Sequence, residues 1–217
     1  MKYLLVGIIM LLVSLGLKGQ RSNEEETEKK TLLSDKPLTG GAISFTGKGG
    51  EISNQEALWL GGEVFTVFDH NLHLGVAGYG LVNTIKSINT DVDEKQLHLQ
   101  CGYGGLFIEP AILENKLVNI SFPVLLGAGG IGETRVSGFV DDLSGIDDFE
   151  LEGDDFYNSD FFWIIEPGVG VNLNISQWMK LSAGVSYRYA YDLELPQTSS
   201  TLLDGFNGNV SLKLGWF

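Results

Sequence analysis

The sequence has little cysteine and little positive charge, and each shortage excludes a class of protein. One cysteine among 217 residues excludes an internal disulfide framework and a cysteine-rich zinc site. Fourteen Lys and Arg residues stand against 28 Asp and Glu, which gives a formal charge of −14. Nucleic-acid binding needs a basic surface that neutralises phosphates, so no nucleic-acid partner is expected. Charged residues make up only 19% of the chain, which is too few for a disordered polyelectrolyte.

Long hydrophobic runs are also missing, apart from a short one at the N-terminus. Lys2 precedes an apolar run, Tyr3–Leu17, which Lys18 ends. This run is shorter than the about 20 residues of a membrane-spanning helix. Its charged start and apolar centre are those of a secretory signal peptide. We expect residues 1–20 to be a signal peptide, with a retained N-terminal anchor as the alternative, and the polar residues 21–37 to be a periplasmic lead-in.

From residue 38 onwards, apolar side chains alternate with small or polar ones, which is the pattern of a β-strand. In Met179–Tyr191 every odd position is apolar and the last three of these are tyrosines, whereas the even positions are small or charged. The same alternation runs through Phe161–Leu173, Val118–Ala128 (with Leu125 as an exception) and Asn209–Trp216. Ordinary strands have about 5–6 residues. A strand that crosses a membrane needs about 9–11 residues, and the predicted strands are long enough for this.

The connections between strands predict a closed transmembrane barrel. Four further strands, with weaker alternation, are expected at about Thr39–Gly47, Glu56–Phe68, Leu72–Thr84 and Lys95–Glu109. The seven connections alternate between long and short, beginning with a long one: Lys48–Gln55, Asp69–Asn71, Ile85–Glu94, Pro110–Asn115, Glu133–Asp160, Asn174–Gln177 and Asp192–Phe206. Outer-membrane barrels have an even number of strands, long extracellular loops and short periplasmic turns. We predict an all-β fold in which residues 38–217 form an eight-stranded antiparallel up-and-down barrel in the outer membrane.

Aromatic residues stand near the strand ends, where a membrane interface favours them. This topology places one group at the outer rim and one at the inner rim: Tyr187, Tyr189, Tyr191, Phe161 and Trp163, then Trp178 and Trp216. Cys101 lies between the apolar Leu99 and Tyr103. We expect it to face lipid as a small hydrophobic residue rather than act as a reactive thiol.

Two segments resemble known proteins. The terminal VSLKLGWF resembles the end signal of bacterial outer-membrane barrels, and Gly102–Gly130 resembles the small eight-stranded barrels of Bacteroidetes, the outer membrane protein β-barrel domain family. The resemblance covers about residues 39–217. It implies a cell-envelope protein of a Gram-negative bacterium that contacts outer-membrane lipid and is inserted by the barrel assembly machinery. In the usual end signal the residue two before the final Phe faces lipid. Here that residue is Gly215, and the alternation turns Trp216 outward instead.

The lumen is expected to be filled. An eight-stranded barrel is just wide enough to be filled by its own side chains, so a water-filled pore is not expected. The alternation turns five charged residues inward: Glu63 and Glu166 at mid-depth, Lys180 and Lys213 nearer the periplasm, and Arg188 nearer the outside. Opposite charges in a low dielectric should pair. We expect a structural ion-pair network, with a proton or ion path as the alternative.

No catalytic set can be assembled from this sequence. His70 and His73 are expected at the periplasmic end and His98 near the extracellular end, so they cannot share one centre. Ser121 and Ser182 are expected to face the lumen without a nearby histidine, and the G-x-S-x-G motif is missing. We therefore expect no enzyme, with neither catalytic nor cofactor-binding residues.

The Glu133–Asp160 connection is unusually acidic. Nine carboxylates and no Lys or Arg lie between Asp141 and Asp160. Calcium takes six to eight oxygen ligands, so six of these residues are candidate metal ligands: Asp147, Asp148, Glu150, Glu152, Asp154 and Asp155. Their spacing does not match an EF-hand. The alternative is a solvated acidic loop.

Two kinds of function remain open. The first is a non-enzymatic outer-membrane barrel that displays acidic extracellular loops, with a structural, adhesion or partner-binding role. The second is a membrane-embedded lipid-processing enzyme or small-solute conduit. A soluble ligand-binding barrel would need apolar residues inside and polar residues outside, and the long strands argue against it.

Overall fold

The computed structural model describes residues 38–90, 96–114, 116–134, 158–196 and 198–217. The chain divides into two units, Met1–Ser34 and Asp35–Phe217, and every described residue belongs to the second unit. The expected signal peptide and polar lead-in lie outside the described residues, as do residues 135–157 of the acidic connection. Within the described part of the chain, no helix is long and apolar enough to cross a membrane.

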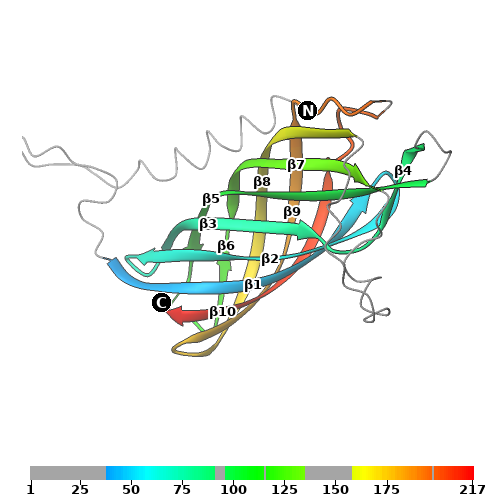
Figure 1. Ribbon diagram of the computed structural model, residues 1–217. Helices are drawn as coiled ribbons and strands as arrows, with labels where there is room; N and C mark the ends of the chain where they lie inside the picture. Colours follow the sequence, from blue (N-terminus) through cyan, green and yellow to red (C-terminus); the bar gives the residue numbers. More distant parts are fainter. Residues whose placement is uncertain (1–37, 91–95, 115, 135–157, 197) are drawn as a thin grey trace, which may run out of the picture. The chain divides into compact units, whose positions relative to one another are not determined.

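Ten strand segments form one antiparallel sheet (Figure 1). They are β1 (Leu38–Ile52), β2 (Gln55–Phe68), β3 (Leu72–Leu81), β4 (Ile85–Thr90), β5 (Gln96–Ile112), β6 (Val118–Ser121), β7 (Val124–Thr134), β8 (Asn158–Ser176), β9 (Met179–Tyr191) and β10 (Gly205–Trp216). Consecutive segments pair with each other, except β3 with β4 and β6 with β7, and β10 pairs with β1 from Gly41↔Trp216 to Gly50↔Asn207. The sheet therefore closes into a barrel.

Two of the eight wall strands are interrupted, which explains the ten segments. β6 and β7 both pair with β5 on one side and β8 on the other, and Phe122-Pro123 separates them. Proline lacks the N–H that a sheet ladder needs. β3 and β4 both pair with β5, with residues 82–84 between them. The predicted antiparallel barrel of eight strands is thereby confirmed.

The predicted facing of the strands is confirmed. Along β9 the odd positions are turned outward and the even positions are buried, as Val185 (52% exposed) and Ser186 (7%) illustrate. The same alternation continues through β8 and β10. Trp216 faces outward and is 76% exposed, as expected from the departure in the end signal. The Phe217 ring turns toward the barrel interior and lies near Phe65 and His73.

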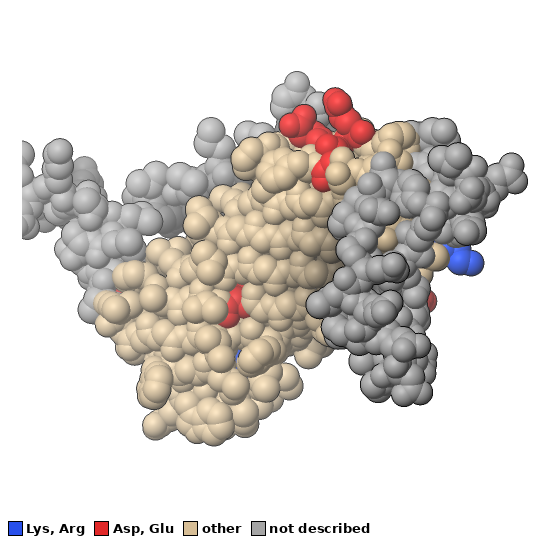
Figure 2. All heavy atoms as spheres, in the orientation of Figure 1, with Lys and Arg blue, Asp and Glu red and all other residues tan. Residues whose placement is uncertain are grey.

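An apolar belt covers the outside of the barrel. Large exposed hydrophobic side chains come from strands all around it, among them Phe45, Leu60, Val64, Val76, Leu106, Leu126, Val169, Val185, Val210 and Leu212. Charged side chains are sparse on the face seen in Figure 2, where most of the red atoms gather at the top of the view. Aromatic pairs stand on the outer surface, with ring centroids 5.5 Å apart in Phe161–Trp163 and 6.0 Å apart in Tyr189–Tyr191. Such a surface suits hydrocarbon and not water.

The long connection expected at Lys48–Gln55 is wrong. β1 and β2 pair up to Ile52↔Gln55, so only Ser53 and Asn54 form the turn. Both have left-handed backbone, with φ of 49° and 62°, as two-residue hairpin turns of the mirror-image type require. The polar residues before this turn continue the strand instead of leaving it, which places Lys48 inside the barrel. The short turn expected at Asp69–Asn71 is confirmed.

The expectation that Cys101 faces lipid is also wrong. Cys101 is buried on the inward face of β5, together with Leu99 and Tyr103. The reason is that the outer half of the lumen is itself apolar. An apolar side chain there does not indicate contact with lipid.

Candidate functional site: the filled lumen

The outer half of the lumen is an apolar layer. Its buried residues come from seven strands and from the β9–β10 connection: Ile52, Ala57, Trp59, Ile85, Leu97, Leu99, Cys101, Ile131, Phe162, Ile164, Ala190, Leu193, Leu195, Leu202 and Leu203. Four of these are leucines of the connection, which folds inward over the lumen. The outer end of the barrel is therefore closed by a packed core like that of a soluble domain.

Arg188 and Asp204 fasten this connection to the wall. The buried Arg188 donates a 2.5 Å hydrogen bond from Nε to the carbonyl of Leu203, and its guanidinium carbon lies 4.6 Å from the centre of the Trp59 ring. The Asp204 carboxylate accepts a hydrogen bond of 2.8 Å from the Ala190 amide. Burial raises the pKa of Asp204, while the Ala190 bond and the Arg188 charge oppose this effect.

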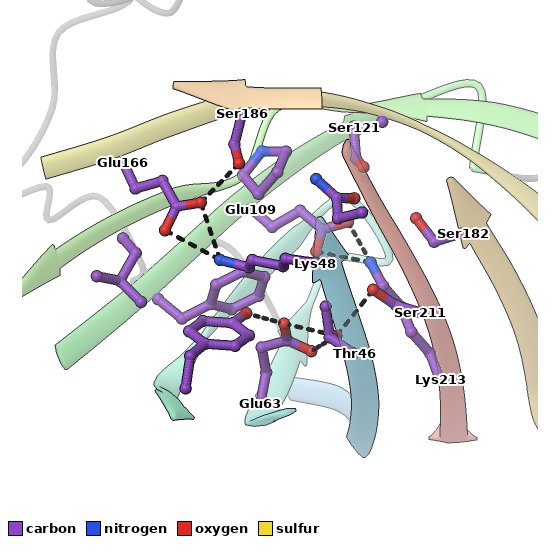
Figure 3. A pocket seen from close by; sticks show the side chains of 16 residues that line it. Thr46, Lys48, Glu63, Glu109, Ser121, Glu166, Ser182, Ser186, Ser211 and Lys213 are labelled. Carbon is purple, nitrogen blue, oxygen red and sulfur yellow. Dashed lines mark hydrogen bonds and ion pairs between the residues drawn. The ribbon is translucent and has the colours of Figure 1, made fainter. Parts of the chain in front are cut away.

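A polar cluster lies below the apolar layer and is centred on Lys48 and Glu166 (Figure 3). Lys48 Nζ lies 2.9 Å from both carboxylate oxygens of Glu166. Glu166 also accepts hydrogen bonds from the Tyr103 hydroxyl (2.9 Å) and the Ser186 hydroxyl (2.6 Å). The buried carboxylate is thus fully partnered, as burial of a charge requires.

Glu63 is held by hydroxyl groups. Thr46 donates to its two oxygens over 3.0 and 3.1 Å, and the Tyr79 hydroxyl donates to the same carboxylate. Thr46 also lies 2.8 Å from Ser211 across the β1–β10 ladder. Lys48 links this group to Glu166, because its Nζ lies 3.4 Å from the centre of the Tyr79 ring.

A second ionic cluster fills the inner end. Lys213 Nζ lies 2.5 and 2.7 Å from the two oxygens of Glu109, and Lys180 is paired with Glu114. His73 lies between the two carboxylates, 3.7 Å from Glu109 and 3.9 Å from Glu114. Its ring is stacked on Phe65 with centroids 4.9 Å apart. The lumen is therefore occupied from the apolar layer down to the periplasmic mouth.

The space left between the clusters is small. A cavity of about 50 Å³ lies between the side chains labelled in Figure 3. A water molecule needs roughly 10–15 Å³ of such space, so the cavity has room for a few waters. In the described residues, no group of three His, Cys, Asp or Glu side chains is placed to hold a metal ion.

The five charged residues predicted to face the lumen all do so, but their ion-pair partners differ from those expected. Glu63, Glu166, Lys180, Arg188 and Lys213 are buried, and the ion pairs formed join three of them to residues that the sequence did not indicate. Those partners are Lys48, Glu109 and Glu114. Lys48 had been assigned to a loop. Glu109 shares the inward parity of Phe107, and this alternation is the sequence signal for its position. Glu114 follows Leu113, whose left-handed φ of 61° redirects the chain.

The remaining candidates are distributed as follows. His70 and His73 lie at the inner end, and His98 lies near the outer end of β5, as predicted. Ser121 and Ser182 are buried in the lumen, where Ser121 accepts a hydrogen bond from Asn172 and does not adjoin His98 at the other end. The metal candidates Asp147, Asp148, Glu150, Glu152, Asp154 and Asp155 lie outside the described residues.

Comparison with known proteins identifies a fold and no family. No family model and no curated protein matches the sequence. The chain is similar in structure to neisserial surface protein A, with a TM-score of 0.50 and 11% identity over 84% of this chain and 99% of that one. The N-terminal β-barrel domain of Pseudomonas aeruginosa OprF gives 0.47 and 9%, covering 81% and 99%. Ail, the attachment invasion locus protein of Yersinia pestis, in complex with the heparin analogue sucrose octasulfate, gives 0.46 and 13%, covering 83% and 99%.

The fold and the facing of its side chains define the class. A closed antiparallel barrel with an apolar belt outside and buried ion pairs inside is an outer-membrane β-barrel. The resemblance to the Bacteroidetes barrels, the signal peptide and the Gram-negative source remain predictions.

Proposed function

We propose that this protein is a sealed, non-enzymatic outer-membrane barrel whose role lies in what it presents at its outer end. The observation that carries the proposal is that the lumen is filled at both levels. An apolar layer fills its outer half, and ionic clusters fill the part below. A conduit needs a continuous aqueous path, and a lipid-processing enzyme needs a polar active site that is open at one rim of the barrel. The cavity that the described residues leave among the lumen charges has a volume of about 50 Å³, enough for a few water molecules.

The outer end supplies the surface for display. Exposed carboxylates of the described residues stand there, from Glu51 and Glu56 of the first hairpin to Asp192 and Glu194 after β9. The acidic connection adds nine more. A surface of this charge suits divalent cations, which could bridge it to anionic lipopolysaccharide, or a basic extracellular partner. A structural, adhesion or partner-binding role is consistent with such a surface.

Conductance measurements separate this proposal from the conduit. Purified protein in planar lipid bilayers should give no stable conductance steps, because neither layer leaves a path for ions. The double variant Lys48→Ser/Glu166→Ser removes the central ion pair as a unit and serves as a comparison for a loosened lumen. Discrete open steps of the unmodified barrel at moderate voltage would favour the alternative of a small-solute conduit.

Labelling of cysteine variants tests the display. In a Cys101→Ala background, Ser199→Cys places a thiol in the exposed β9–β10 connection, and Asn71→Cys places one in the exposed turn at the opposite end. A membrane-impermeant maleimide should label the first on intact cells and the second only after lysis. The reverse result would mean that the acidic end faces the periplasm, and the proposed role would then be wrong.

A further inference from the structure

In the described part of the barrel wall, the pairing between β2 and β3 stops before β2 ends. The ladder between β2 and β3 runs from Phe68↔Leu72 to Trp59↔Leu81, and a last backbone bond of 2.9 Å joins Val82 N–H to the Leu58 carbonyl. β2 continues beyond this point to Gln55 and faces β4. Among the described residues, no backbone register joins β2 to β4, although both are paired on their other side.

Two side-chain amides fill this gap. The Leu58 N–H donates to Asn83 Oδ1 over 2.7 Å, and Asn83 Nδ2 donates to the Glu56 carbonyl over 2.7 Å. The Lys86 N–H donates to Gln55 Oε1 over 3.0 Å, and Gln55 Nε2 donates to the Lys86 carbonyl over 2.9 Å. Each primary amide offers one carbonyl acceptor and N–H donors, like a peptide unit. Asn83 and Gln55 therefore take the place of a piece of strand.

A wall closed in this way differs from a ladder. Ladder bonds are fixed by the backbone on both sides and break only when a strand separates. A side-chain amide is released by rotation about its own χ angles, and all four bonds lie at the exposed end of the barrel where water competes for them. Directly behind the gap lie Trp59 and Ile85, which are fully buried in the apolar layer.

We propose that this seam, formed by Gln55, Glu56, Leu58, Asn83 and Lys86, is a lateral opening point of the barrel wall. Rotation of the two amides separates β2 from β4 at the outer end while every strand ladder of the barrel stays intact. The opening uncovers the apolar layer at Trp59 sideways, toward the outer membrane interface, without unplugging the ionic clusters below. The display role does not depend on this seam.

Hydrogen exchange measured by NMR on the barrel in lipid nanodiscs tests the seam. The amides of Leu58 and Lys86 should exchange at least about tenfold faster than that of Val64, which lies within the β1–β2–β3 ladders. Asn83→Ala should accelerate Leu58, and Gln55→Ala should accelerate Lys86, each by a further tenfold or so. Asn174→Ala is the matched control, since Asn174 Nδ2 binds the carbonyls of Glu114 and Lys116 at the other end of the barrel.

Quenching of Trp59 fluorescence gives a second, independent measurement. Trp59 is buried, whereas the other three tryptophans are exposed, so Trp163→Phe/Trp178→Phe/Trp216→Phe leaves a single reporter beside the seam. The quenching constant for acrylamide should rise several-fold in Gln55→Ala/Asn83→Ala and stay unchanged in Asn174→Ala. Heat-modifiable gel migration verifies that each variant is folded. If folded seam variants leave both exchange and quenching at the level of the parent, the seam is a static joint and the proposal is wrong.

Discussion

Lys213 and Glu109 form an ion pair across the lumen although 104 residues separate them in the chain. β10 and β5, which carry them, lie on opposite sides of the ring. The pair therefore holds opposite walls together, and both side chains are almost completely shielded from solvent. Neighbouring His73 and Phe65 complete the packing around the pair.

Lys213→Met should destabilise the barrel more than any exposed lysine variant. Removing one partner of a buried pair leaves an uncompensated charge, which costs about 3–5 kcal/mol of unfolding free energy. Lys213→Met/Glu109→Gln should recover more than half of this loss, because the stranded carboxylate is then gone. The measurement is urea unfolding of the protein in lipid vesicles.

Lys116→Met is the control for that series. Lys116 is exposed in the β5–β6 connection, and its replacement should change the unfolding free energy by less than about 0.5 kcal/mol. A double variant that is less stable than Lys213→Met would mean that the pair is not what holds the two walls.

Val185→Arg should impair folding into membranes. Val185 stands in the middle of β9 and faces outward, and an arginine on the lipid face costs about 2–4 kcal/mol at the bilayer midplane. Val185→Leu keeps the surface apolar and should fold in vesicles as well as the parent. Equal folding yields for the Arg and Leu variants would place Val185 outside the hydrocarbon, and the membrane position of the belt would need revision.

The facing of the long strands could be predicted from the sequence because a period of two is a direct consequence of strand geometry. Val185 and Ser186 illustrate how well this works where one side meets lipid and the other meets polar groups. It failed for Cys101, because near the outer end of β5 the apolar positions Leu97 and Leu99 face the lumen and the polar His98 and Gln100 lie on the other side.

The ion pairs could not be predicted, because they depend on which strands lie opposite each other and at what height. The sequence places Lys48 in a loop because the polar run around it resembles a connection. The actual turn has only two residues, Ser53 and Asn54, and its requirement is left-handed backbone at both. The seam at Asn83 and Gln55 has no sequence signal, since an asparagine after a strand is an ordinary turn residue and Gln55 falls in a predicted connection. The β2–β3 hairpin, continued beyond Leu81, brings them to opposite backbone edges.

Asp204 should make a pH-dependent contribution to stability. Burial raises its pKa in the folded state, so the folded barrel keeps this proton at pH values where the unfolded chain has lost it. The contribution is complete below the unfolded pKa of about 3.9 and is lost as the pH rises through the folded pKa. The stability of the parent relative to Asp204→Asn should therefore decrease between about pH 4 and pH 7.

Unfolding midpoints in urea, measured for both proteins at each pH, give this difference directly. The effect should be small, because the carboxyl group is partly exposed and solvent screens it. Ser199→Ala, in the same connection, removes no titratable group and should show a constant difference from the parent. If the stability of the parent relative to Asp204→Asn instead increases with pH, the folded barrel stabilises the charged form of Asp204.

The last prediction concerns the acidic connection, of which residues 135–157 lie outside the described part of the chain. β7 ends and β8 begins on the side opposite the chain's C-terminus, so the connection between them belongs to the same end as the Ser53-Asn54 turn. A broad-specificity protease added to intact cells should therefore cut between Asp141 and Asp160.

The nine carboxylates of this segment repel one another at low ionic strength, and a divalent cation that bridges them should make the segment more compact. Calcium should then slow the cut several-fold, whereas a variant with Asn or Gln at Asp147, Asp148, Glu150, Glu152, Asp154 and Asp155 should be cut at the same rate with or without calcium. Protection in intact cells, with cleavage only after lysis, would invert the topology. Cleavage that calcium leaves unchanged in the parent would mean that these carboxylates are a solvated acidic surface and bind no calcium.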